Sequence, residues 1–181
     1  MSVITMKQGV INDTQSGTAT RTVAGAPVAG TNEVQTLTIG GTPSGGTFKV
    51  AFDGNVSSSI TWSATNATLL ANMNTAMDAM GTIGTSGCVA TAGTLTAGIG
   101  TIILTFGANL AKKAVNLMTI DTNALTGSAP TLAIAETTPG VDATHRGLGA
   151  GEQVLDITNS KLYVNTGTAL APTWTVVGAQ S

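Results

Sequence analysis

The stretch Thr65–Met80 (TNATLLANMNTAMDAM) decides the fold, because it is the only clear helical pattern in a sequence rich in Gly and Thr. Its larger apolar residues recur at spacings of about three and four, which places them in one stripe along a helix. These residues are Leu69, Leu70, Met73, Met77 and Met80. Thr65 stands where an N-cap is expected, and Gly81 comes after the last apolar residue, where helices commonly end. We therefore expect one amphipathic helix over about Thr65–Met80.

The segments before this helix predict strands. Glu33–Ile39 and Thr47–Asp53 alternate between apolar and polar residues, which is the pattern of strands with one buried face. The segment Gly40–Gly46 between them contains Pro43 and four glycines, so it predicts the loop of a hairpin. Ile60–Ser63 continues the alternation and predicts a third strand directly before the helix.

The segments after the helix also favour strands. Cys88–Ala92 and Thr101–Phe106 predict a second hairpin, and Thr119–Asp121 and Thr131–Thr137 are two further strand candidates. Asn109–Leu117 is compatible with either a short helix or a loop. The expected fold class is therefore α+β and mainly β, with antiparallel sheets and one helix packed against them.

The two ends of the chain predict extensions from this core. Residues 1–32 (Met1–Asn32) show no sustained period and are expected to form an extended N-terminal arm. Residues 33–140 are expected to form the β-rich core domain, 141–151 a Gly-rich linker, and 152–181 a C-terminal β extension. Three short strands are expected in that extension, at Gln153–Ile157, Lys161–Asn165 and Thr173–Val177. A sheet of three short strands is only marginally stable alone, so we expect it to pack against the core domain or against other copies.

Charge is scarce in this sequence. Charged residues make up 9% of the chain, against about 25% in typical soluble domains. Glycine appears 23 times and threonine is more frequent still, so hydroxyl groups must solvate much of the surface. The net charge is −2, and the pair Lys112 and Lys113 is the densest basic feature. We therefore expect no nucleic-acid partner, and we expect assembly to cover part of the surface.

The residues that could carry catalysis are few and scattered. His145 is the single histidine and lies in the Gly-rich linker, without a G-x-S-x-G pattern to supply a nucleophile. Cys88 is the single cysteine and favours a buried structural role. The acidic residues are spread singly, without the clusters that metal ions need. We expect no enzyme activity, no catalytic residue, no metal and no cofactor.

Three features of the sequence indicate the cellular compartment of the protein. A single cysteine excludes an intrachain disulfide framework. The most apolar run, Leu95–Leu110, is interrupted by three glycines and is too short to span a membrane. Met1–Val10 lacks the continuous apolar core of a signal peptide. We expect a soluble protein without a membrane partner, made and kept in a reducing cytosol.

Four residues outside the core domain are candidates for partner contacts. Arg21 and Val23 belong to the one strand-like run of the arm, which could add to a neighbouring sheet as a strand. Tyr163 and Trp174 are two of the few large aromatic residues, and they could pair across the terminal strands. The alternative for these two aromatic residues is that they anchor the packing of those strands.

Three passages resemble a module of tailed-phage structural proteins. They are Asn32–Asp53 (NEVQTLTIGGTPSGGTFKVAFD), Ile60–Met80 (ITWSATNATLLANMNTAMDAM) and Gly127–Gly140 (GSAPTLAIAETTPG). In that module a strand, a Gly-Gly-x-Pro-x-Gly-Gly loop and a second strand precede a helix. The closing segment Leu155–Gly178 resembles the terminal motif of phage head-decoration, head-fibre and tail-fibre proteins. Together these passages cover roughly half of the chain.

The resemblance implies a virion structural protein. The small size of the chain and the absence of a heptad stalk or collagen-like run favour a capsid decoration (cement) protein. Such a protein would be made in the cytoplasm of the host bacterium and would bind the major capsid protein on the head surface, most simply as a trimer. The alternative is a head-fibre or tail-fibre tip that binds a host receptor or a carbohydrate.

Overall fold

A computed structural model describes residues 20–178, which form two compact units. Residues 20–30 and 142–178 form one, here called the terminal unit, and Thr31–Val141 form the other, the inserted unit. The chain therefore enters the inserted unit once, returns once, and completes the terminal unit with its last strands. The protein is mainly β, with one α-helix, as the sequence predicts.

The predicted helix is present as α1 (Asn66–Asp78) in the inserted unit. Its buried side chains are Leu69, Met73, Ala76 and Met77, which confirms the apolar stripe. Met80 is also buried but lies just past the helix, whose C-cap is Ala79 and not Gly81. Thr65 occupies the N-cap position in an extended conformation, but its side chain makes no capping hydrogen bond.

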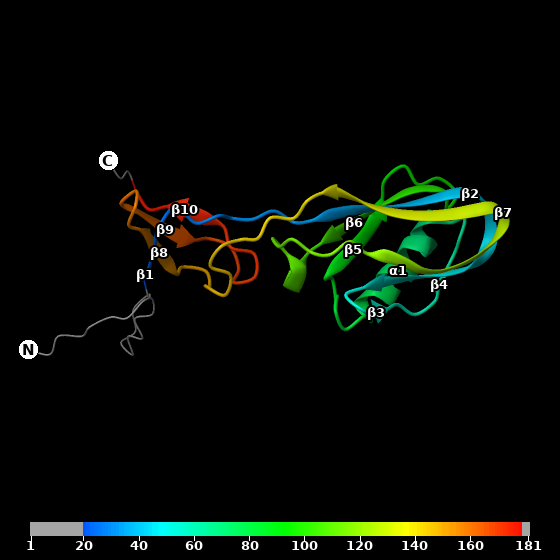
Figure 1. The fold of residues 1–181 in the computed structure, drawn as a ribbon, viewed down its shortest axis with the longest axis horizontal. Helices are drawn as coiled ribbons and strands as arrows, with labels where there is room; N and C mark the ends of the chain where they lie inside the picture. The colour runs from blue at the N-terminus through cyan, green and yellow to red at the C-terminus, as the bar shows by residue number, and fades with distance from the viewer. Residues whose placement is uncertain (1–19, 179–181) are drawn as a thin grey trace, which may run out of the picture. The chain divides into compact units, whose positions relative to one another are not determined.

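The expected hairpin around Gly40–Gly46 is wrong, because that segment lies inside one continuous strand, β2 (Val34–Phe52). Its partner is β7 (Thr119–Thr138), which also joins two segments that the sequence predicts as separate strands. The two strands pair antiparallel along their lengths, with register shifts at Gly40/Thr42 and Pro43/Gly45. Such shifts are β-bulges, which bend a strand without ending it. Figure 1 shows β2 and β7 running side by side and bending together.

The remaining strands of the inserted unit complete its sheet. They are β3 (Asn55–Val56), β4 (Ile60–Thr61), β5 (Cys88–Ala92) and β6 (Gly100–Phe106). The strand order is β3-β2-β6-β5, with β4 and β7 also paired to β2, and the predicted β5–β6 hairpin is confirmed. Large buried side chains from β2 and β6, with those of α1, form the core. Phe52 and Phe106 stack there at 5.4 Å between ring centroids.

The segment Asn109–Leu117, whose sequence is compatible with either a helix or a loop, is mostly irregular. A 3-10 helix, η1 (Ala108–Leu110), occupies only its start. Two buried side chains of the inserted unit hold the irregular chain beyond this helix. Glu33 accepts a hydrogen bond from the backbone N–H of Val115 at 2.8 Å, and Gln35 accepts one from Met118 at 2.9 Å.

The terminal unit contains a four-stranded sheet in the order β1-β8-β9-β10. Its strands are β1 (Thr20–Val23), β8 (Gln153–Asp156), β9 (Lys161–Asn165) and β10 (Trp174–Val176). Strand β1 is parallel to β8, and the other pairs are antiparallel. The three predicted C-terminal strands are therefore present, and a strand from the N-terminal side joins them.

The expected arm and linker are not free segments. Their residues 20–30 and 142–151 belong to the terminal unit, and Thr31, Asn32 and Val141 belong to the inserted unit. Of the arm Met1–Asn32, residues 1–19 lie outside the described part, and Thr20–Val23 is not an isolated extension but a strand paired with β8. In the expected linker, Ala143 is buried, and the hydroxyl of Thr144 accepts the backbone N–H of Val28 at 2.8 Å. Backbone pairing thus satisfies groups that a free arm and a free linker would leave to water.

Candidate functional site

The four predicted contact residues lie on one face of the terminal sheet. Arg21 pairs with Val154, Val154 with Tyr163, and Tyr163 with Val176, so this row crosses all four strands. Val23 and Trp174 are two residues from members of the row, and alternate residues of a strand share a face. Figure 1 shows the four strands that carry them. The structure therefore brings the four residues together on what we call the inner sheet face.

The inner sheet face is covered in part, and its members Arg21, Lys161 and Val176 are exposed. Its members Val154, Asp156 and Asn165 are buried. Tyr163, Trp174 and Val23 are half-buried, and Arg21 is exposed. Trp174 lies opposite Asn165 and not opposite Tyr163, so the two aromatic residues are not direct cross-strand partners. These positions favour packing for the two aromatic residues, and a role in partner contacts stays a prediction.

The ring that contacts Trp174 belongs to His145. The two ring centroids are 6.1 Å apart and the planes meet at 85°, an edge-to-face arrangement. Burial, and then the positive charge of Arg21, lower the pKa of His145 below its ordinary value. No hydrogen bond joins the imidazole to another described side chain, so nothing orients it as a general base. The geometry assigns His145 to packing against Trp174.

Asn165 organises two loops of the terminal unit. Its side-chain N–H groups donate to the backbone carbonyls of Leu148 at 2.7 Å, Gly149 at 3.3 Å and Thr168 at 3.4 Å. Its side-chain oxygen accepts the backbone N–H groups of Gly167 and Thr173, each at 2.9 Å. A buried amide with every donor and acceptor used specifies one loop geometry.

Asp156 holds the β8–β9 turn and the end of β1. Its carboxylate accepts the backbone N–H of Thr158 at 2.9 Å and of Asn159 at 3.2 Å, and the Asn159 side-chain amide at 2.6 Å. It also accepts the backbone N–H of Gly25 at 2.9 Å. Burial alone would raise the pKa of Asp156, but these hydrogen bonds to the charged form lower it below its ordinary value.

The terminal unit is therefore expected to lose stability in acid. A carboxyl group whose pKa is lower in the folded state stabilises the fold above its unfolded pKa of about 3.9. That contribution disappears as the pH falls through the lower folded pKa. Urea unfolding monitored between about pH 7 and pH 2 should show a falling midpoint for the terminal unit. Asp156→Asn should lower the midpoint at neutral pH and flatten its acid dependence, whereas Asp121→Asn at an exposed site should change neither.

Sequence reasoning missed Asp156 and Asn165 as the residues that organise the unit. A local signal for both was present. Asp and Asn side chains often accept the backbone N–H of the residue two positions later in a turn. Asp156 lies two residues before Thr158, and Asn165 lies two residues before Gly167. The contacts to Gly25 and Leu148 had no such signal, because they join segments that are distant in sequence or in different loops.

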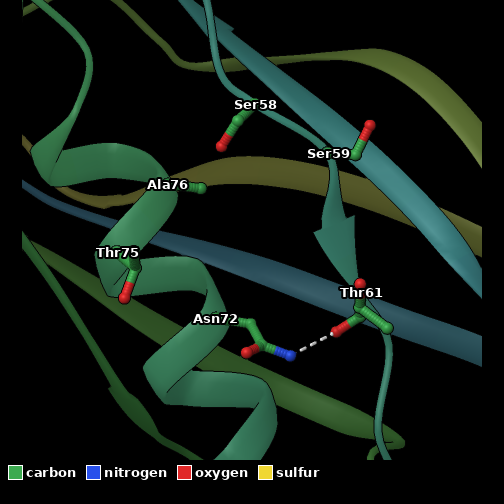
Figure 2. Close-up of a pocket in the computed structure, with 6 residues that line it drawn as sticks. All are labelled: Ser58, Ser59, Thr61, Asn72, Thr75 and Ala76. Atoms are coloured by element: carbon green, nitrogen blue, oxygen red, sulfur yellow. Dashed lines mark hydrogen bonds between the residues drawn. The ribbon is translucent and has the colours of Figure 1, made fainter.

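A polar hollow of about 170 Å³ lies between α1 and the chain that leads into β4. Figure 2 shows its lining residues, which are Ser58, Ser59, Thr61, Asn72, Thr75 and Ala76. Asn72 donates a side-chain hydrogen bond to the carbonyl of Thr61 at 2.9 Å. The lining offers hydroxyl and amide groups but no titratable side chain, so acid–base chemistry has no group to use there.

Cys88 at the start of β5 is buried in the core of the inserted unit. Burial, and then the negative charge of Asp78, raise the pKa of Cys88 to about 12. The thiolate is the reactive form of cysteine, so this side chain is inert at neutral pH. The geometry agrees with the structural role that the sequence predicts for it.

A metal site and a membrane-spanning helix are both absent from the part of the chain that the structure describes. Within residues 20–178, no group of three or more His, Cys, Asp or Glu side chains is placed to hold a metal ion. In the same range, no helix combines the length and apolar character needed to cross a membrane. Comparison with protein-family models gave no match, and a search of curated proteins gave none either.

Proposed function

We propose that this protein is a structural component of a tailed-phage particle that decorates the outer surface of the head. It would be made in the cytoplasm of the host bacterium and would bind the major capsid protein. Each copy would bridge neighbouring capsid subunits. The copies would form a homo-oligomer, with a trimer as the simplest arrangement. The sequence resemblance supports this proposal. The Gly-Gly-x-Pro-x-Gly-Gly segment and the helix both lie in the inserted unit, and the closing segment lies in the terminal unit.

The observation that carries the proposal is an uncharged sheet face on each of two units. On the inserted unit, the face opposite the core is formed by Thr36, Thr38, Val89, Thr91, Thr101, Ile103, Thr105, Ala133 and Ala135. The terminal unit has a comparable face, on which Thr22, Leu155 and Leu162 lie side by side. Interface cores are depleted in charged residues, and a bridging protein needs two contact surfaces. Two uncharged faces on separate units meet that need without any reactive group.

The proposal is tested on purified particles that carry the gene for this protein. A reconstruction of the particle should show many copies over the head, and quantitative mass spectrometry should give a copy number comparable with that of the capsid protein. Location only at the tail tip would favour the fibre alternative and overturn the proposal. Absence from the particle would overturn both.

A pair of variants tests the face on the inserted unit. Thr38→Lys places a charge in the middle of that face, where Thr38 is exposed. Added to particles that lack the protein, this variant should bind with a strongly reduced copy number, because a buried unpaired charge is costly. Thr85→Lys adds the same charge at an exposed turn position outside the face and should bind like the unchanged protein. Equal binding by both variants would exclude this face as the capsid contact.

A further inference from the structure

Strand β7 forms a long edge of the sheet in the inserted unit, because within the described residues it pairs with β2 alone (Figure 1). In an antiparallel sheet, the backbone groups of alternate residues point to opposite neighbours. The N–H of Phe106 donates to the carbonyl of Glu33 at 3.0 Å, so Glu33 faces β6. The β2 residues that face β6 are therefore Gln35, Leu37 and Ile39, and those between them face β7.

A short stretch of β7 leaves its outer backbone groups unpaired. Opposite the β2 residues that face β7 lie Ala133 and Ala135, so the backbone groups of these two alanines bond to β2. The alternate residues turn their N–H and carbonyl groups away from β2, and they are Leu132, Ile134 and Glu136. Within residues 20–178, no hydrogen bond to protein reaches these outward groups. We call this stretch the open edge.

The chain closes the opposite edge of the same sheet with its own side chain. The N–H of Gly93 donates to the carbonyl of Thr101 in β6 at 2.9 Å, so the alternate residue Ala90 of β5 faces away from β6. Its N–H donates to the side-chain oxygen of Asn74 at 2.8 Å, and its carbonyl accepts the Asn74 amide at 3.2 Å. Helix α1 thus satisfies outward groups of β5 as a further strand would.

The open edge also lacks the features that usually prevent strand addition. Natural edges are blocked by lysine, by proline, by bulges or by being very short. Between Pro130 and Glu136 the sequence has no charge and no further proline, and the register with β2 is continuous. A row of alternating N–H and carbonyl groups matches an extended polypeptide, whose own groups repeat at the same spacing. The chemistry of the open edge therefore specifies an extended chain as its occupant.

We propose that the open edge binds an extended segment of the major capsid protein, which joins the sheet as an added strand. This inference rests on the proposed function and names the way in which the capsid is held. Ala133 and Ala135 belong to the uncharged face already assigned to the capsid contact, so the face and the open edge form one continuous surface. At a rise of about 3.4 Å per residue, roughly five residues of the partner would suffice.

The first test is the binding of variants to particles that lack this protein. Glu136→Pro removes an outward N–H and leaves the pairing with β2 intact, since proline is tolerated where the N–H faces solvent. Binding should weaken by roughly tenfold or more, because a hydrogen bond is lost and the ring stands against the added strand. Glu136→Gln removes only the charge and should bind like the unchanged protein.

Ala92→Pro is the matched control on the opposite edge. Ala92 is exposed and lies two residues after Ala90, so its N–H also points away from β6. This variant should bind the particles like the unchanged protein. Circular dichroism checks that each variant is folded.

The second test is hydrogen exchange resolved to single amides of the unchanged protein. In the free protein, the amides of Leu132, Ile134 and Glu136 should exchange rapidly, whereas those of Ala133 and Ala135 should be protected by β2. On the particle, all five should be protected. This alternation is specific for strand addition, because a contact through the sheet face alone would leave the outward amides unpaired.

The outcomes separate this inference from the proposed function. If the unchanged protein and Glu136→Pro bind the particle equally well, the added strand is excluded while the decoration role stands. If the unchanged protein does not bind, the proposed function fails and the capsid is excluded as the partner. Outward amides that are already protected in the free protein would show that a segment of this chain or a second copy covers the open edge, which also overturns the inference. Equal losses for Glu136→Pro and Ala92→Pro would contradict a contact at this edge.

Discussion

Asn165→Asp is expected to unfold the terminal unit while the inserted unit stays folded. The substitution keeps the shape of the side chain but replaces its N–H donors with a charged oxygen. That oxygen would face the carbonyls of Leu148, Gly149 and Thr168, which now receive hydrogen bonds. Asn165 is buried, so water cannot screen the new repulsion or solvate the new charge.

The free-energy cost of the buried charge is compared with the total stability of the terminal unit. An uncompensated buried charge costs about 3–5 kcal/mol. A unit of roughly fifty residues has a free energy of unfolding of about 2.5–7.5 kcal/mol. The loss is therefore comparable to the whole stability of the unit. Hydrogen exchange should show lost protection in peptides from 142–178 and retained protection in peptides from 31–141.

The control for this prediction is Asn123→Asp. Asn123 is exposed, and its side-chain oxygen accepts the backbone N–H of Leu125 at 3.2 Å, a role that a carboxylate keeps. Its amide also donates to the carbonyl of Pro130 at 3.3 Å, but at this exposed site water can replace that bond and solvate the new charge. This variant should retain protection in both units. Protection of 142–178 that survives Asn165→Asp would show that the amide does not hold the two loops.

Gly46→Ala is expected to destabilise the inserted unit by about 3 kcal/mol. Gly45→Ala is the control. Gly46 lies in β2 at a φ of +90°, where residues with a side chain are strained. A Cβ there would lie 2.3 Å from the carbonyl oxygen of Ala124 and 2.8 Å from the Cα of Leu125. Both atoms belong to the backbone of β7, so the clash cannot be relieved by a side-chain rotation.

Gly45→Ala should cost less than about 1 kcal/mol. Gly45 has no positive φ, and a Cβ there would lie 3.3 Å from the hydroxyl oxygen of Thr126, which can rotate away. The measurement is urea unfolding of both variants, monitored by the fluorescence of Trp62 in the inserted unit. Equal midpoints for the two variants would mean that this part of β2 is a pliable loop and not a bulged strand.

The elements that the sequence predicts correctly are those whose signals are local. Apolar residues at helical spacing predict α1, and alternation predicts the β5–β6 hairpin, because each pattern depends only on near neighbours. The segment Gly40–Gly46 is mistaken for a loop for the same reason. Its glycines and Pro43 resemble turn residues, but β7 pairs with most of the segment from about eighty to ninety residues away, and Gly41 and Ser44 fall at the β-bulges.

The terminal unit is harder to predict, because its main contacts join distant parts of the chain. Nothing in Thr20–Val23 indicates that its partner is β8. Without that pairing, the sequence assigns Arg21 and Val23 to an arm, and His145 to a linker. The two aromatic residues are recognisable as unusual, but the neighbour of Trp174 is His145, which periodicity cannot reveal.

The insertion of one unit into another has a consequence for the order of folding. Thr20 and Gln153 are 133 residues apart, so their pairing in an unfolded chain closes a very long loop. In the folded inserted unit, Thr31 and Val141 exchange two backbone hydrogen bonds of 3.0 Å, which sets their Cα atoms about 5.5 Å apart. The remaining loop is then roughly two dozen residues, which lowers the entropy cost of closure by about 1.5 kcal/mol. Folding of the inserted unit therefore brings the two segments of the terminal unit close together, and the terminal sheet is expected to be the last part of the chain to form.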